Sequence, residues 1–374
     1  MKIKICKECV ITNLKPNIII DKNGVCSACK NHKIKKKIFD NKNKKILHST
    51  FKDLILKNTK KNNKYDVVVA VSGGKDSIYQ IIELKKITKK ILAVCVDFGL
   101  RTKIGEENLS LICEKLNVDL LKFSVKKSLL KKLAIFSLKK HGDPDLFNHP
   151  LIYNIPPIVA NYFKVKTVVY GEDPRVEYSK AKISNRKTLT NLKFDKNYYN
   201  NFIIHSKINL TEILDKLKIP NEDKEIFKFK KKLKNTKILF LGNYLKWNSI
   251  NNFKIAKKFG FKTQLRGEGT FRNYVNVDED WNRVHHYLKL LKFGYGRCTD
   301  HACEEIRNGY ISRKKGIALV KKYDRQPLSN YYKKRISNYL NIKIIDLEMN
   351  IEKYRNRKIW IYKNKKWMLN FEIK

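Results

Sequence analysis

Five short apolar runs constrain the fold of this chain most strongly. They occupy residues 66–71, 91–98, 119–125, 166–170 and 237–242, and most are rich in β-branched residues. Unbroken runs of this kind, separated by helical stretches, are typical of parallel strands that are buried on both faces of a sheet. The pattern predicts a doubly wound α/β domain over residues 65–249, with ligand at the carboxyl ends of the strands.

The flanking segments differ in composition. Residues 1–35 form a short Cys-rich element with few helix signals, and residues 36–64 are rich in Lys and Asn, which predicts a solvated connector that could carry a short helix. Residues 180–235 are polar and predict an insertion near the ligand edge of the sheet. Residues 250–345 indicate a mainly helical region, and residues 346–374 a hairpin-like tail with alternating aromatic and polar residues.

Composition excludes several classes of protein. With 42% hydrophobic residues among 374, the chain can bury a core and is not a disordered basic tail. No apolar run approaches the roughly 18 residues that cross a bilayer. The start of the sequence has no apolar stretch of the kind found in secretory signals, so we expect a cytoplasmic protein.

The formal net charge is +47. Such a charge can reflect a nucleic-acid partner. Lysines, however, are spread along the whole chain and are abundant together with Asn and Ile, as AT-biased codons would produce. We therefore favour the compositional explanation, although a polyanionic partner stays the main alternative.

Two cysteine pairs have the spacing of a metal site. Cys6 and Cys9 form one C-x2-C pair, Cys26 and Cys29 form another, and Gly24 supplies a tight turn before the second. Two such pairs can present four sulfurs to one tetrahedral ion. Disulfides are disfavoured in a reducing cytoplasm, and paired spacing is unusual for core thiols. The pattern predicts one structural zinc ion.

A glycine-containing loop follows the first predicted strand, and its residues are Ser72, Gly73, Gly74, Lys75, Asp76 and Ser77. Glycines allow close approach of an anion, and the start of the following helix offers free N–H groups. The spacing fits neither a Walker A loop nor a dinucleotide fingerprint. An ordinary βα turn is the alternative. The motif resembles the pyrophosphate loop (PP-loop) of the ATP pyrophosphatase superfamily, which implies that ATP is bound, that pyrophosphate is released and that Asp76 helps to hold Mg²⁺.

Further candidates lie at the ends of other strands. Asp97 ends the second strand and is our candidate for binding the nucleoside of ATP, with a simple strand cap as the alternative. Gly171, Glu172 and Asp173 end the fourth strand. Their glycine and two carboxylates suit nucleotide, Mg²⁺ or an incoming amine.

The combined motifs resemble those of the N-acetyl sugar amidotransferases. These enzymes make acetamidino groups in O-antigen (lipopolysaccharide), pseudaminic acid and legionaminic acid biosynthesis. The resemblance runs from Cys6 to about Asp324 and rests on the cysteine pairs, the PP-loop, residues 171–179 with Glu177 and Tyr178, and residues 293–301 with Arg297, Asp300 and His301. Three positions depart from the family pattern: Asp173 stands where Asn is expected, and Cys298 and Cys303 stand where small residues without a thiol are expected.

The resemblance implies an adenine nucleotide α-hydrolase-like fold and an ATP-dependent amidotransferase that uses ATP, Mg²⁺ and Zn²⁺. Lys75 and Asp76 are then the predicted catalytic residues. The chain has neither a G-x-C-x-G motif nor an N-terminal cysteine with which to hydrolyse glutamine. The family accordingly implies a separate glutaminase of the histidine-biosynthesis type, with a cyclase-like subunit that channels ammonia. We expect that partner on the helical region after residue 250.

Some features leave two interpretations open. The stretch from Arg266 to residue 272 is Gly-rich and charged, and it either grips an anionic sugar nucleotide or is a solvent loop. Cys298, His301 and Cys303 are more typical of a helix with buried thiols than of a second metal site. A PP-loop enzyme that modifies tRNA is the alternative function. A zinc-ribbon nucleic-acid binder is disfavoured by the intact PP-loop.

Overall fold

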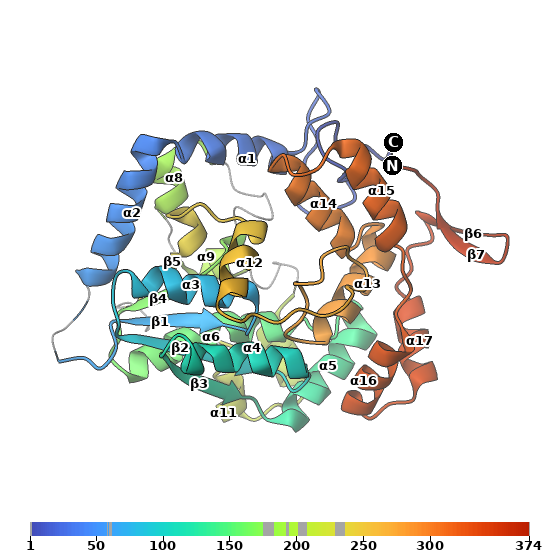
Figure 1. The fold of residues 1–374 in the computed structure, drawn as a ribbon. Helices are drawn as coiled ribbons and strands as arrows, with labels where there is room; N and C mark the ends of the chain where they lie inside the picture. The colour runs from blue at the N-terminus through green and yellow to red at the C-terminus, as the bar shows by residue number, and fades with distance from the viewer. Residues whose placement is uncertain are drawn as a thin grey trace.

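The computed structural model describes residues 2–57, 59, 62–174, 183–191, 194–200, 208–228 and 236–373. Its centre is one five-stranded sheet with the strand order β3-β2-β1-β4-β5 (Figure 1). The strands are β1 (Val67–Val71), β2 (Ile91–Asp97), β3 (Asp119–Ser124), β4 (Thr167–Tyr170) and β5 (Lys237–Phe240). All four neighbouring pairs are parallel. The predicted doubly wound α/β fold is therefore confirmed.

Side-chain alternation places two hydrophobic cores on opposite faces of the sheet. Val68 belongs to a core with α5 (Lys127–His141) and α6 (Asn148–Tyr162). Val67 and Val69 belong to a second core with α3 (Lys75–Lys85), α4 (Lys103–Glu114) and α12 (Ser249–Lys258). Burial on both faces explains the continuous apolar runs of β1, β2 and β4, whereas the edge strand β3 is partly exposed.

The structure differs from the prediction between residues 27 and 64. Instead of a mostly solvated connector it contains two helices, α1 (Ser27–Ile38) and α2 (Asn41–Leu56). Asp40 caps α2 by accepting a hydrogen bond from the amide of Asn43 at 2.8 Å. Leu47, Phe51 and Ile55 recur every four residues and are buried. These three buried positions carry the apolar face of the helix. The segment around them is rich in Lys and Asn, so its composition indicated a solvated connector.

Between β4 and β5 the described residues form only short helices. These are α8 (Arg186–Thr190), α9 (Lys196–Tyr198), α10 (Leu210–Lys216) and α11 (Asn221–Lys224). After α12 the chain is mainly helical, as predicted, with α13 (Trp281–Phe293), α14 (Arg297–Arg307), α15 (Arg313–Tyr323) and α16 (Asn330–Leu340).

The tail agrees with the prediction only in its second half. Residues 344–352 form a further helix, α17 (Ile344–Glu352), and not part of a hairpin. Strands β6 (Trp360–Lys363) and β7 (Lys366–Leu369) then pair in antiparallel fashion. Asn364 and Lys365 turn between them with positive φ angles of 51° and 58°. None of the helices in the described residues is long and apolar enough to cross a membrane.

Candidate active site

The four predicted cysteine ligands converge at the N-terminus. Their sulfurs lie within 4.8 Å of one another, and all four residues are buried. The Sγ atoms of Cys9 and Cys26 are 3.7 Å apart, and those of Cys6 and Cys29 are 4.0 Å apart. Four thiolates at Zn–S distances of about 2.3 Å would be separated by about 3.8 Å, so the set fits a tetrahedral Zn²⁺. None of the cysteines forms a disulfide in the part of the chain that the structure describes.

The cysteine element is attached to the C-terminal helices (Figure 1). Arg313 donates to the carbonyl oxygens of Cys9 and Cys6 at 3.1 and 3.2 Å. Asp300, a predicted substrate residue, forms ion pairs with Lys15 of the cysteine element at 2.9 Å and with Lys289 at 2.5 Å. Burial alone would raise the pKa of Asp300, but the two ammonium groups outweigh it and hold that pKa below its usual range. Asp300 thus joins three segments.

The PP-loop has the geometry of a compact anion cradle. Ser77 Oγ accepts a hydrogen bond from the amide of Ser72 at 2.9 Å, and Ser72 Oγ accepts one from the amide of Gly74 at 3.3 Å. Gly73 has a φ of +86°, and a Cβ there would lie 2.7 Å from the carbonyl oxygen of Gly105. Helix α3 begins at Lys75, and no side chain among the described residues caps its first turn, although the amide of Ser77 donates to the carbonyl oxygen of Gly74 at 3.0 Å.

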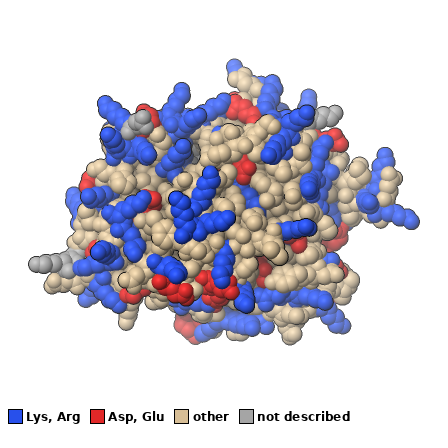
Figure 2. Space-filling model, in the orientation of Figure 1, with Lys and Arg blue, Asp and Glu red and all other residues tan. Residues whose placement is uncertain are grey.

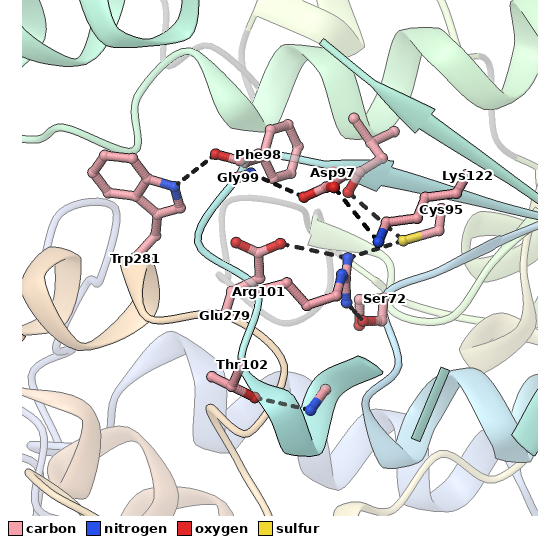
Figure 3. Close-up of polar contacts among 12 residues, drawn as sticks. Ser72, Cys95, Asp97, Phe98, Gly99, Arg101, Thr102, Lys122, Glu279 and Trp281 are labelled. Atoms are coloured by element: carbon pink, nitrogen blue, oxygen red, sulfur yellow. Dashed lines mark hydrogen bonds and ion pairs between the residues drawn. The ribbon is translucent and has the colours of Figure 1, made fainter. Parts of the chain in front are cut away.

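Behind the loop, Arg101 connects three parts of the chain (Figure 3). Its guanidinium donates to the carbonyl oxygen of Ser72 at 2.5 Å and to Cys95 Sγ at 2.9 Å, and it lies 3.4 Å from the carboxylate of Glu279. Burial raises the pKa of Glu279 well above its usual value, although Arg101 lowers it in part. Sequence reasoning missed Arg101 and Glu279, because no motif joins residues 178 positions apart.

Asp97 lies beside this cluster at the end of β2 (Figure 3). It accepts a hydrogen bond from the amide of Gly99 at 2.9 Å and is 3.6 Å from Lys122 Nζ. This is the geometry of the strand cap that we weighed as the alternative. A contact with the nucleoside stays a prediction.

The residues that follow β4 point in different directions in the structure. Glu172 accepts a hydrogen bond from Trp247 Nε1 at 3.2 Å, and the ring of the same tryptophan lies 2.6 Å from where a Cβ on Gly171 would be. Asp173 is 2% exposed and accepts hydrogen bonds from Tyr198 at 2.9 Å and Asn243 at 2.7 Å. Asp173 points into the protein interior and does not line the cavity described below. Glu177 and Tyr178 lie outside the described residues.

One cavity joins the PP-loop, the cysteine element and α14. It has a volume of about 490 Å³, and its wall includes Lys75, Asp76 and Glu172 on the side of the sheet. Eight cationic side chains line it, against four carboxylates. The cations are Lys15, Lys35, Lys36, Lys75, Lys246, Arg272, Arg297 and Arg307. An anionic ligand is therefore favoured.

Helix α14 presents its polar face to this cavity. The lining residues recur at helical spacing and are Arg297, Asp300, His301, Cys303, Glu304 and Arg307. His301 Nδ1 lies 2.6 Å from Thr270 Oγ1, and burial lowers the pKa of His301 well below its usual value, so its ring is neutral at pH 7.

The structure shows how the remaining candidate residues near α14 lie relative to the cavity. Arg266 is exposed and does not line the cavity, whereas Arg272, at the other end of the same stretch, does. Cys298 donates a hydrogen bond to the carbonyl oxygen of Leu319 at 3.3 Å. Within the described residues, the N-terminal set is the only group of His, Cys, Asp or Glu side chains with the geometry of a metal site, so no second metal site forms around Cys298, His301 and Cys303.

Two known protein families match separate parts of the chain. Residues 268–374 match the family described as "LPS biosynthesis protein WbpG-like, C-terminal domain", and residues 66–144 match "Queuosine biosynthesis protein QueC", a PP-loop ATP pyrophosphatase family. No curated protein matches the chain.

Several solved structures resemble the chain weakly. One is an NH3-dependent NAD synthetase from Campylobacter jejuni, with 16% identity over 59% of this chain and 98% of that one, at a TM-score of 0.29. The U34-tRNA thiolase NcsA from Methanococcus maripaludis has 15% identity over 83% and 87% of the two chains, at 0.32. An NAD+ synthetase from Burkholderia pseudomallei has 10% identity over 84% and 94%, at 0.35.

Proposed function

We propose that this chain, which joins a PP-loop ATP pyrophosphatase domain to a WbpG-like domain of LPS biosynthesis, is an ATP-dependent amidotransferase. Its substrate is the N-acetyl group of a nucleotide-activated sugar, and its product is the acetamidino sugar of a surface glycan. The observation that carries the proposal is the cationic cavity that the two regions share. Lys75 and Asp76 of the PP-loop and the polar face of α14 in the WbpG-like domain line the same space.

The chemistry requires activation because the oxygen of an acetamide is a very poor leaving group. The amide oxygen attacks the α-phosphate of ATP, a P–O bond to the β-phosphate breaks, and pyrophosphate leaves with the electron pair. Ammonia then adds to the adenylated imidate, the adduct loses a proton, and AMP departs. The protein contributes by orienting the reactants and neutralising their charge.

Particular residues support the first step. Lys75 is 7% exposed, lines the cavity and would neutralise charge on the departing pyrophosphate, next to the amides of the PP-loop. Asp76 also lines the cavity and would hold Mg²⁺, which supplies further charge neutralisation when bound. Asp76 Oδ1 accepts a hydrogen bond from Asn252 at 2.8 Å, so its carboxylate is oriented by α12.

Ammonia comes from a partner in this proposal. The partner is a glutaminase of the histidine-biosynthesis type with a cyclase-like subunit, as the family resemblance implies. Delivery through a channel is chemically sensible, because an adenylated imidate exposed to water would hydrolyse before dilute ammonia reached it.

The surface charge gives no comparable support for tRNA modification. Figure 2 shows Lys and Arg scattered over the visible face, with carboxylates between them and no continuous cationic stripe. A gel shift with bulk tRNA at increasing salt tests this alternative, since binding to RNA phosphates weakens steeply with salt.

The experiment uses purified protein with ATP, Mg²⁺, ammonium and a UDP- or CMP-linked N-acetyl sugar. The nucleotide products should be AMP and pyrophosphate, and the sugar should change by about −1 Da, since one oxygen is replaced by one NH. Lys75→Ala and Asp76→Ala should each abolish turnover. Lys89→Ala is the control, because Lys89 is exposed and follows the C-terminal end of α3, and this variant should keep its turnover. Formation of ADP and phosphate would contradict the adenylation mechanism.

A further inference from the structure

Arg272 is a buried cation on the wall of the active-site cavity. Its side chain is 2% exposed, and Nε donates to Glu305 at 2.9 Å. Nη1 donates to Glu304 at 2.7 Å and to Ser249 at 3.2 Å. These contacts fix the plane and the position of the guanidinium.

The remaining nitrogen of this guanidinium, Nη2, has no hydrogen-bond partner among the described residues. It is also buried. A buried, charged N–H group left without an acceptor is expensive and rare in folded proteins. Since Arg272 lines a cavity in which cations outnumber carboxylates, an anionic ligand is the acceptor that fits.

Two ring contacts relate Arg272 to the PP-loop. The ring centroid of Tyr274 lies 5.8 Å from Arg272 Cζ and 5.8 Å from Lys75 Nζ, so both cations lie close to the same aromatic ring. Helix α12 provides a second connection, because Ser249 contacts Arg272 while Asn252, one turn later, contacts Asp76. Arg272 therefore lies next to the pyrophosphate loop but outside it.

This position suits the phosphate that the loop itself does not hold. The PP-loop accounts for the β- and γ-phosphates, which leave as pyrophosphate. The α-phosphate must lie between the loop and the sugar. Arg272 contacts α14 through Glu304, and it lies close to the same Tyr274 ring as Lys75. We propose that Arg272 is a catalytic residue of adenylation whose guanidinium contacts the α-phosphate of ATP, an assignment that rests on the proposed function.

In this step the amide oxygen of the sugar forms a bond to the α-phosphorus, and the bond from that phosphorus to the β-bridging oxygen breaks. Pyrophosphate takes the electron pair. Negative charge on the non-bridging α-oxygens would face a guanidinium that three hydrogen bonds, two of them ion pairs, already hold in place. Preorganised charge of this kind stabilises a transition state without reorganisation.

The test compares Arg272→Lys with Arg283→Lys. Arg283 is the matched control, because it is also buried and is held by Glu268 at 2.7 Å and by the carbonyl oxygens of residues 326 and 327, but it does not line the cavity. Calorimetry measures the binding of AMP to each variant while Mg²⁺ and pyrophosphate fill the PP-loop. Arg272→Lys should weaken AMP at least about tenfold, the effect of losing one charge-assisted hydrogen bond, and should leave pyrophosphate binding unchanged.

Sugar-dependent exchange of pyrophosphate into ATP provides the second readout. It should fall in Arg272→Lys through kcat and stay near wild type in Arg283→Lys. The proposal is overturned if Arg272→Lys binds AMP as Arg283→Lys does, if it loses pyrophosphate and not AMP, or if only the KM for the sugar changes. Should wild-type protein show no exchange with any N-acetyl sugar, the proposed function fails, while the AMP measurement still decides the role of Arg272.

A second variant keeps the test valid if Arg272→Lys does not fold. Arg272→Gln combined with Glu305→Gln removes buried charges of both signs together, which limits the penalty of an unpaired buried charge. It should show the same selective loss of AMP affinity. Wild-type affinity for AMP in this double variant would also refute the assignment.

Discussion

Replacing Gly73 by alanine should disable the PP-loop through two separable costs. The first is conformational, since Gly73 has a φ of +86° and an L-residue in the left-handed region costs about 1–2 kcal/mol. The second is steric. The added Cβ would lie 2.7 Å from the carbonyl oxygen of Gly105 in α4, a backbone atom that cannot rotate away.

The loop must therefore move away from α4 until this contact reaches at least 3.0 Å. The amides that would bind pyrophosphate move with it. Because misplacing reacting groups by about 1 Å can cost about 100-fold in rate, we expect turnover in Gly73→Ala to fall at least about tenfold. AMP formation at saturating ATP measures this loss.

Gly309→Ala separates the two costs. Gly309 has a φ of +76°, but a Cβ there would meet nothing within 4 Å. Chemical denaturation should show a loss of about 1–2 kcal/mol in both variants from the backbone conformation. Only Gly73→Ala should also lose turnover. If the two variants had equal turnover, the tight contact between the loop and α4 would have no part in catalysis.

Three further predictions concern the metal, an ion pair and the partner. One equivalent of Zn²⁺ should copurify by metal analysis, and Cys9→Ser should lower the unfolding midpoint more than it alters AMP formation; reduced protein without zinc would contradict this. Asp300→Asn should destabilise the fold by about 3 kcal/mol at pH 7 by leaving Lys15 and Lys289 without their carboxylate. Because the pKa of Asp300 is lowered in the folded state, this gap should persist above pH of about 4 and shrink as the pH falls further, and urea denaturation at several pH values would refute the role if the gap were constant. Glutamine should support amidine formation only when the glutaminase partner is added, and its use by the purified chain alone would disprove that division of labour.

The sheet could be predicted closely because its signal is local. Each of the five strands begins and ends within two residues of a predicted run. Burial along nearly the whole length of β1, β2 and β4 favours apolar residues there, whereas the edge strand β3 is only partly covered and contains Asp119 and Lys122. The cysteine cluster is equally local, because each C-x2-C pair specifies its own turn. Helix α2 was harder to predict, because its signal is not local, and the sequence indicated only a connector that could carry a short helix. Its three buried positions form a stripe one residue wide, and tertiary packing, not composition, makes it a helix.

The candidate site was only partly predictable, since its polar contacts join distant segments. Asp173 stands in a motif beside Glu172, yet Asn243 and Tyr198 draw its carboxylate into the interior. Two residues that are neighbours in sequence can therefore point in different directions, Glu172 toward the cavity and Asp173 into the core. No spacing rule indicates that Asp300 pairs with Lys15, 285 positions away. Pairings of this kind follow from the fold and not from the motif.

Two side chains of the C-terminal region lie close to the PP-loop of the α/β domain. Glu279 reaches Arg101 behind the PP-loop, and Arg272 lies beside Lys75 in front of it, although both come from the WbpG-like region that starts at residue 268. This region thus contacts Lys75 of the PP-loop through Tyr274, and through Glu279 it contacts Arg101, which donates to the carbonyl oxygen of Ser72. Removing that region would leave Arg101 without Glu279 and the cavity without α14. The proposed adenylation site therefore depends on both regions, and a chain ending before residue 268 should not retain it.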